Sequence, residues 1–443
     1  MGYIVGNRTL ASFSGSQTAL QIQKEDDWDF ELADTQHHTH GMHNYPARMV
    51  PQIAERLIQK YSRSGETVYD PMCGSGTVLV EATLLGRRAI GTDLNPLAVL
   101  LSRVKTTPIA PDYLKSAVSE FLEKINSRFN RLDLQNKRSV PKKPDFLNID
   151  FWFKPEVIDD LAIIRETIFE VKDEQVRDFL LVPFSLTVRK VSNTRPGEFK
   201  LYRYSPTTLS KHSPNVPKLF KEAVKNSTSC LLNYDAVVGA KTNCSIYKAD
   251  ARYTNDIIAD NSVDLIVTSP PYGDSHTTVA YGQFSRLSLQ WLGMGYSEIE
   301  SNDEITHLDR ASLGGSIRKN YDFSLKSKTL NSVLKTIASK DVKRAEEVAW
   351  FFVDLNDVYK QMHRVLREDG IAGIVIGNRT VKDTYIPSSK ITSELCENLG
   401  FETVCGIDRN IPYKTIPLIN SPTNEAGVVG RTMSKENIIV VQK

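Results

Sequence analysis

The feature that most constrains the fold is a glycine-containing loop between a short strand and a helix. GETVYD (65–70) predicts the strand, PMCGSGT (71–77) the loop, and VLVEATLLG (78–86) the helix. RRAIGTDLN (87–95) then predicts a second strand. A strand, a loop, a helix and a second strand in this order begin a parallel, doubly wound sheet.

The same alternation of strands and helices returns in the second half of the chain. A further helix is expected before the first strand, at 46–62, where apolar residues recur at helical spacing. The remaining elements predicted for the sheet are strands at 243–251, 263–272, 370–378, 401–409 and 435–443, with helices at 348–368 and 388–400. We therefore expect an α/β fold with a doubly wound, mostly parallel, Rossmann-like sheet.

Between the two halves lies a stretch of different character, with a helical pattern at 151–191. A chain of 443 residues has room for about two to three domains, but the pattern favours one interrupted sheet domain. We expect 1–107 and 241–443 to form that domain and 108–240 to be a largely helical insertion. Residues 273–345 are expected to form a smaller irregular segment.

The glycine loop and the end of the second strand suggest a ligand that carries a ribose. Glycines allow close approach of the backbone to a ligand and leave amides free at the helix N-terminus. Asp93 follows Asp70 by 23 residues and can accept hydrogen bonds from ribose hydroxyls. Leu79 stands where a dinucleotide fingerprint has its third glycine, and the loop lacks the Gly-Lys-Thr of a P-loop. A tight turn without a ligand is the alternative.

A second loop, Thr268-Ser269-Pro270-Pro271-Tyr272, follows the apolar strand VDLIV. Two prolines make a rigid turn just beyond the strand, where α/β sheets bind ligands. The turn presents a hydroxyl, a carbonyl and an aromatic ring, which suit a planar base with an exocyclic amine. Ser269 and the carbonyl of Pro270 can accept the amino hydrogens, while Tyr272 stacks on the base. Acceptors placed in this way expose the amine lone pair to an electrophilic methyl group. A simple loop is the alternative.

Together these motifs resemble those of S-adenosylmethionine-dependent amino-methyltransferases. The closest likeness is to the DNA cytosine-N4 methyltransferases of bacterial restriction-modification systems. The motifs are DPMCGSGT (70–77), DLNP (93–96) and TSPPY (268–272), supported by segments at 38–51, 273–293 and 409–417 that are similar to family segments. The resemblance implies methyl transfer to a cytosine flipped out of duplex DNA.

The resemblance also implies roles for particular residues. Asp70 is expected to contact the methionine amino group, Asp93 the ribose, Leu94 the adenine ring and Asp250 the adenine amine. The implied cofactor site consists of Tyr45, Pro46, Asp70, Pro71, Cys73, Gly74, Ser75, Gly76, Thr77, Asp93, Leu94, Asp250 and Ala251. The implied catalytic residues are Ser269, Pro270, Pro271 and Tyr272.

Three other functions remain possible and one is unfavourable. DNA adenine-N6 methyltransferases usually carry Asp where Ser269 stands. In some of these enzymes, however, the residue at this position does not match the base that is methylated. RNA guanine-N2 methyltransferases share the cofactor loop but usually begin the second motif with Asn or Asp. A non-enzymatic module could have kept only the cofactor pocket. A carbon-5 cytosine methyltransferase needs a nucleophilic cysteine, usually after proline, and the chain has no Pro-Cys pair.

The charge distribution is uneven and predicts a surface for double-stranded DNA. The whole chain has a net charge of +2, whereas residues 189–225 hold nine Lys and Arg against two Glu, a local charge of +7. With interleaved aromatic residues, this stretch is expected to contact the DNA backbone. The residues expected at DNA are Arg189, Lys190, Arg195, Lys200, Arg203, Arg318 and Lys319. A separate cognate restriction endonuclease is an expected partner, and the oligomeric state stays open.

Histidine and cysteine usage predicts neither a metal site nor disulfides. His37, His38, His40 and His43 lie together, but we expect no acidic or cysteine partner beside them and therefore no metal. The five cysteines are widely separated, which is typical of reduced thiols in a cytoplasmic protein. Neither a secretory signal nor a membrane span is expected from the sequence.

Overall fold

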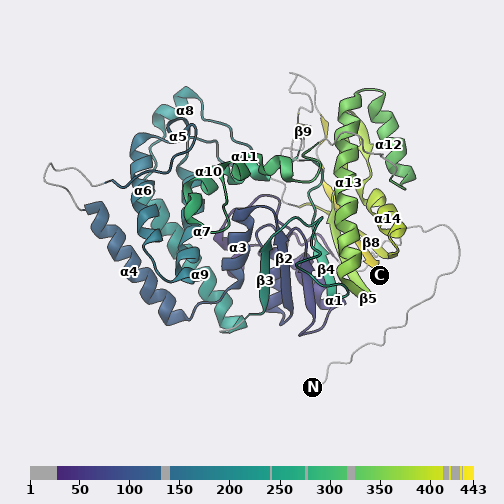
Figure 1. Ribbon diagram of the computed structural model, residues 1–443, viewed down its shortest axis with the longest axis horizontal. Helices are drawn as coiled ribbons and strands as arrows, with labels where there is room; N and C mark the ends of the chain where they lie inside the picture. The colour runs from purple at the N-terminus through teal and green to yellow at the C-terminus, as the bar shows by residue number, and fades with distance from the viewer. Residues whose placement is uncertain are drawn as a thin grey trace.

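The computed structural model describes residues 27–130, 140–239, 242–274, 278–316, 325–412, 419–420, 430–431 and 433–443. Within these residues a seven-stranded sheet has the order β3-β2-β1-β4-β5-β11-β8 (Figure 1). Its strands are β1 (Thr67–Asp70), β2 (Arg88–Asp93), β3 (Cys244–Lys248), β4 (Val263–Thr268), β5 (Leu366–Ile376), β8 (Glu402–Asn410) and β11 (Lys435–Gln442). The pairs from β3 to β5 are parallel, and β11 is antiparallel to both its neighbours. The expected doubly wound, mostly parallel fold is confirmed.

Helices cover both faces of this sheet. Successive residues of a strand point to opposite faces, so an apolar strand can fill two cores. Val68 and Leu265 pack into a core with the first pair of helices, whereas Tyr69 and Ile266 pack into a core with the second pair. The first pair is α1 (Pro51–Tyr61) and α2 (Thr77–Leu84), and the second is α13 (Val342–Val365) and α14 (Ser388–Asn398).

A helical lobe beside the sheet contains the residues between the two halves of the sheet (Figure 1). Its helices are α4 (Pro111–Asn130), α5 (Ile149–Trp152), α6 (Pro155–Phe169), α7 (Glu174–Val191), α8 (Pro206–Lys211) and α9 (Val216–Val238). All of these helices except α8 contribute to an apolar core that they share with α3 (Pro96–Thr106), which includes Leu100, Leu161 and Phe220. The helical pattern expected at 151–191 is divided between α5, α6 and α7. Asp173 begins α7 by accepting a hydrogen bond from the Val176 amide.

The expectation of an irregular segment at 273–345 is wrong, because the structure places three helices there. They are α10 (Tyr281–Leu292), α11 (Asn302–Ala311) and α12 (Lys328–Ala338). Side chains provide their N-terminal hydrogen bonds: Asp309 accepts from the amides of Gly282 and Gln283, and Ser301 caps α11. Apolar side chains of α10, such as Trp291, are buried in the helical-lobe core. Tertiary burial therefore stabilises helices that the local pattern did not indicate.

The remaining elements are short. They are η1 (His38–Met42), η2 (Gly293–Gly295), the pair β6 (Arg379–Val381) and β7 (Thr384–Ile386), and the pair β9 (Ile419–Asn420) and β10 (Gly430–Arg431). No helix among the described residues is both long and apolar enough to cross a membrane. The boundaries at 107/108 and 240/241 stay a prediction.

Candidate active site

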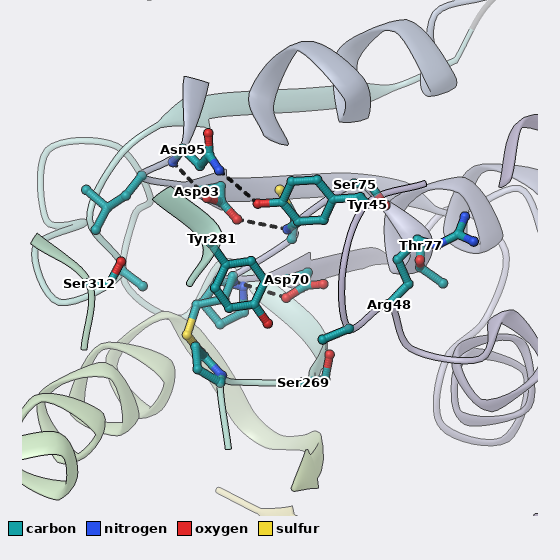
Figure 2. A pocket seen from close by; sticks show the side chains of 18 of the residues that line it. Tyr45, Arg48, Asp70, Ser75, Thr77, Asp93, Asn95, Ser269, Tyr281 and Ser312 are labelled. Carbon is teal, nitrogen blue, oxygen red and sulfur yellow. Dashed lines mark hydrogen bonds between the residues drawn. The ribbon is translucent and has the colours of Figure 1, made fainter. Parts of the chain in front are cut away.

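Three neighbouring strands end at one edge of the sheet, and a pocket lies there (Figure 2). Asp93 is the last residue of β2, Asp70 is the last residue of β1, and Ser269 follows β4. The residues expected from the sequence that line the pocket are Tyr45, Pro46, Asp70, Pro71, Cys73, Gly74, Ser75, Thr77, Asp93, Leu94, Asp250, Ala251, Ser269 and Pro271. Gly76, Pro270 and Tyr272 are not in its lining. Side chains from both motifs therefore meet at the carboxyl edge of the sheet.

The glycine loop has a backbone that only glycine adopts easily. Gly74 and Gly76 have φ values of +50° and +83°. A Cβ atom on Gly76 would also lie 3.0 Å from the Cα of Ser102 in α3. The Ser102 hydroxyl in turn donates a hydrogen bond to the Gly74 carbonyl at 2.8 Å. The close approach of α3 therefore fixes the path of the loop below the pocket.

The carboxylate of Asp93 joins this loop to the end of β2. Its Oδ2 accepts a hydrogen bond from the Gly74 amide at 2.9 Å, and its Oδ1 accepts one from the Asn95 amide at 2.8 Å (Figure 2). Burial raises the pKa of Asp93 to about 6. Each carboxylate oxygen has a further lone pair, so Asp93 can also accept hydrogen bonds from the hydroxyls of a ligand.

Asp70 lies at the centre of the edge and is buried. Its Oδ1 accepts hydrogen bonds from the Thr268 hydroxyl at 2.8 Å and from the Met72 amide at 3.1 Å. Within the described part of the chain, its Oδ2 accepts none. Burial raises the pKa of Asp70 to about 7. A buried carboxylate with one oxygen still available suits a ligand that brings a positive charge.

Comparison with known proteins decides the family. Residues 12–103 match the profile of the N6/N4 DNA methylase family. The chain is 40% identical over 425 residues, 93% of each protein, to the Type II methyltransferase M.MvaI of Kocuria varians. The chain belongs to the Type II DNA methyltransferases of the N6/N4 family. A second relative, the Type II methyltransferase M.BsoBI of Geobacillus stearothermophilus, is 22% identical over 91% of this chain and 85% of its own.

Solved structures resemble the methyltransferase only distantly. An rRNA methyltransferase from Streptomyces viridochromogenes is 10% identical over 90% of this chain and 88% of its own, with a TM-score of 0.31. A DNA modification methylase from Thermus thermophilus, complexed with S-adenosylmethionine, is 18% identical over 44% of this chain and 53% of its own, with a TM-score of 0.21. The order and direction of the strands establish the fold.

The cofactor of the methyltransferase is S-adenosylmethionine, and the pocket fits it. The cofactor is cationic, which matches the buried carboxylate of Asp70, and it carries a ribose with two hydroxyls, which match the partly buried carboxylate of Asp93. The Ser75 hydroxyl is buried in the loop and has no hydrogen-bond partner within the described residues. Because buried polar groups normally have partners, this hydroxyl also points to a polar ligand.

Several pocket residues of the methyltransferase were missed by the sequence reasoning. Tyr281 of α10 stacks on Tyr45, with ring centroids 5.9 Å apart, and both line the pocket. The Asn95 side chain donates hydrogen bonds to the hydroxyls of Tyr45 at 3.0 Å and Ser285 at 2.7 Å. Arg48 and Ser312 also line the pocket. Asn95 lies within the DLNP motif and Arg48 within the family-like segment at 38–51, which was the available signal for both.

Asp250 of the methyltransferase lines the pocket but already has a strong partner. The Arg252 guanidinium donates hydrogen bonds to both Asp250 carboxylate oxygens, at 2.9 and 2.6 Å. Arg252 also pairs with Asp354 at 2.9 Å and donates to the Ala311 carbonyl at 3.0 Å. This arginine therefore ties the rim of the pocket near Asp250 to the end of α11 and to α13.

The expectation that the histidines have no acidic partner is wrong. Nε2 of His37 and Nε2 of His40 lie 2.9 and 2.7 Å from Oε1 of Glu81 in α2. These three side chains form the only group among the described residues whose spacing could hold a metal ion. Short contacts to one shared oxygen are also what two N–H donors make to a carboxylate. A hydrogen-bonded triad therefore accounts for the geometry.

The structure separates the basic residues expected at DNA into three groups. Arg189 lies over the Phe284 ring and donates to the Phe284 carbonyl, so it packs inside the protein. Arg203 lies over Phe151 at 4.1 Å. Lys190 and Arg195 are exposed, and Lys200 is half-buried. Arg318 and Lys319 fall outside the described residues.

Proposed function

We propose that the methyltransferase modifies the exocyclic N4 amine of cytosine in duplex DNA. The observation that carries this proposal is the position of Ser269, which follows β4 and lines the same pocket as Asp70 and Asp93. A serine hydroxyl at this point is a neutral hydrogen-bond acceptor for a base amine. We further propose that the modification protects DNA from a separate, cognate restriction endonuclease.

The cofactor would be held by the residues that line the sheet edge. Asp70 would accept hydrogen bonds from the methionine amino group, and Asp93 from the ribose hydroxyls. Leu94 would pack on the adenine ring, with Asp250 and the backbone at Ala251 beside it. Tyr45, Pro46, Cys73, Ser75 and Thr77 would complete the enclosure, with Gly74 and Gly76 beneath. When bound, S-adenosylmethionine supplies an electrophilic methyl group on its sulfonium sulfur.

The Ser-Pro-Pro-Tyr loop would hold the flipped target base. Pro270 and Pro271 fix the turn, Tyr272 offers an aromatic face, and Ser269 and the Pro270 carbonyl accept the hydrogens of the base amine. Held in this way, the amine nitrogen directs its lone pair toward the cofactor side of the pocket. The residues act through position and electrostatics, without a covalent enzyme intermediate.

We assign contact with the DNA backbone to the exposed basic residues of the helical lobe. Lys190 is exposed in the last turn of α7, Arg195 is exposed in the loop that follows, and Lys200 is half-buried in the same loop. Arg203, Arg318 and Lys319 remain candidates, whereas Arg189 is better explained as a packing residue. Exposed cations of this kind add affinity that depends on salt and not on sequence.

The proposal is tested with purified protein, labelled cofactor and unmethylated DNA. Ser269→Ala is expected to lower methyl transfer by about 100-fold, because one well-placed polar group near a reacting atom contributes at this level. Cofactor affinity is expected to stay unchanged. Ser262→Ala, at the other end of the same strand, is the matched control. Wild-type turnover in Ser269→Ala would refute the role of the serine.

A further inference from the structure

Tyr272 is held in place by residues that the cofactor pocket does not include. Its ring lies against the backbone at Gly377, just beyond β5. A Cβ atom on Gly377 would come within 2.7 Å of Cδ2 of the tyrosine. The Cδ2 side of the ring therefore has a close neighbour, and a larger residue at position 377 would collide with this ring and with Sδ of Met433.

The hydroxyl of Tyr272 is held as well. It donates a hydrogen bond of 2.9 Å to Oε1 of Glu436 at the start of β11. Burial, together with the neighbouring Glu436 charge, raises the pKa of the Tyr272 hydroxyl. The phenol therefore stays protonated and acts as the donor. Hydrogen bonds to an ionised acceptor are about twice as strong as neutral ones.

Glu436 is in turn fixed from the neighbouring strand. Its other oxygen, Oε2, accepts a hydrogen bond from Arg409, which is its direct cross-strand partner in the β8–β11 pair. The Arg409 side chain is buried and also donates to the carbonyls of Trp28 at 2.9 Å and Asp29 at 3.1 Å. Because both carboxylate oxygens are engaged, Glu436 has little freedom to turn away from the tyrosine.

We propose that Glu436 is a positioning residue for methyl transfer, which it supports by orienting the ring of Tyr272. The inference rests on the proposed role of Tyr272 as the surface on which the target base stacks. A tyrosine held at its ring by Gly377 and at its hydroxyl by Glu436 presents one ring plane before the base arrives. Preorganised placement of this kind raises turnover because less ordering remains for the reaction step. It applies equally to a cytosine or an adenine.

The test compares Tyr272→Phe, Glu436→Gln and the double variant in a methyl-transfer assay with unmethylated genomic DNA. Each single substitution is expected to lower kcat by about tenfold, since small misplacement near the reacting groups has effects of this order or larger. Phe keeps the ring, and Gln keeps the size of the side chain next to Arg409. The KM for the cofactor and the thermal midpoint should stay near those of wild type. Glu402→Gln, an exposed position on β8, is the matched control.

The double variant separates orientation from a general structural role. If Glu436 acts through Tyr272, the double variant is expected to be no slower than the slower single variant. Losses that multiply to about 100-fold would show independent effects and overturn the inference. Wild-type kcat in Glu436→Gln would overturn it too. Wild-type turnover in Tyr272→Ala would instead refute the proposed base pocket, so the two failures are distinguishable.

Discussion

The main-chain amide of Gly74 donates a hydrogen bond to Oδ2 of Asp93, and the two atoms lie 2.9 Å apart. This contact joins the glycine loop to the end of β2, so the two parts of the cofactor site cannot move independently. A ligand that binds Asp93 therefore also meets a loop that is already ordered.

Replacing Asp93 is expected to weaken cofactor binding more than it slows methyl transfer at saturating cofactor. Asp93→Ala removes both the acceptor for the ribose and the partner of the Gly74 amide. Loss of such an acceptor corresponds to about 1–3 kcal/mol, or about 5- to 150-fold in the dissociation constant. Isothermal titration calorimetry with S-adenosylmethionine measures this dissociation constant. Asp112→Ala, exposed in α4, should bind like wild type, and equal affinity in both variants would contradict the assignment.

Cofactor affinity is expected to fall as the pH is lowered from 8 to 6. Burial raises the pKa of Asp70 to about 7 and that of Asp93 to about 6. Below those values the free protein carries protonated carboxyls, and a cationic ligand must displace a proton to bind. The affinity then falls by at most about tenfold per pH unit for each group. Cofactor titrations at several pH values measure how the logarithm of the affinity changes with pH. Asp70→Asn is expected to make this dependence shallower. The same dependence in Asp70→Asn and wild type would remove Asp70 from the site.

The sequence predicted the site well where one short segment contains the whole signal. The glycine loop, Asp93 and Ser269 each follow a strand directly, so their positions depend on local pattern and sheet topology. Tyr281 and Glu436 could not be found in this way, because their partners lie on strands or loops distant in the chain. Glu81 was missed for the same reason: its place beside His37 and His40 depends on how η1 packs against α2.

The histidine triad is expected to stabilise the fold. Glu81→Ala leaves the buried His40 without its acceptor and should lower the free energy of unfolding by about 2–4 kcal/mol. Urea denaturation measures the free energy of unfolding. The control is Glu120→Ala, at an exposed position in α4, which should change this free energy by less than about 0.5 kcal/mol. A loss no larger than that of the control would contradict the triad.

The triad also gives a pH signature. The hydrogen bond to Glu81 raises the pKa of His37 from 6.5 to about 9. The stability that protonated His37 contributes is therefore fully present below pH 6.5 and is lost as the pH rises through about 9. The destabilisation by Glu81→Ala should shrink over that window. A pH-independent difference would show that His37 is not charged there.

Exposed cations of the helical lobe are expected to set the salt dependence of DNA binding. Removing both Lys190 and Arg195 should reduce the slope of log K against log salt by about 2, since each phosphate contact contributes about 0.9. Fluorescence anisotropy over a salt series measures the slope. Lys335→Ala with Lys343→Ala removes the same charge from α12 and α13 and is the control. Equal slopes in both double variants would show that Lys190 and Arg195 do not contact the DNA backbone.

The product of the reaction tests the central claim most directly. Unmethylated DNA is incubated with the purified protein and isotopically labelled S-adenosylmethionine, digested to nucleosides and analysed by mass spectrometry. We predict that the label appears in N4-methylcytosine and that Ser269→Ala lowers its amount by about 100-fold. Label found only in N6-methyladenine would contradict the account.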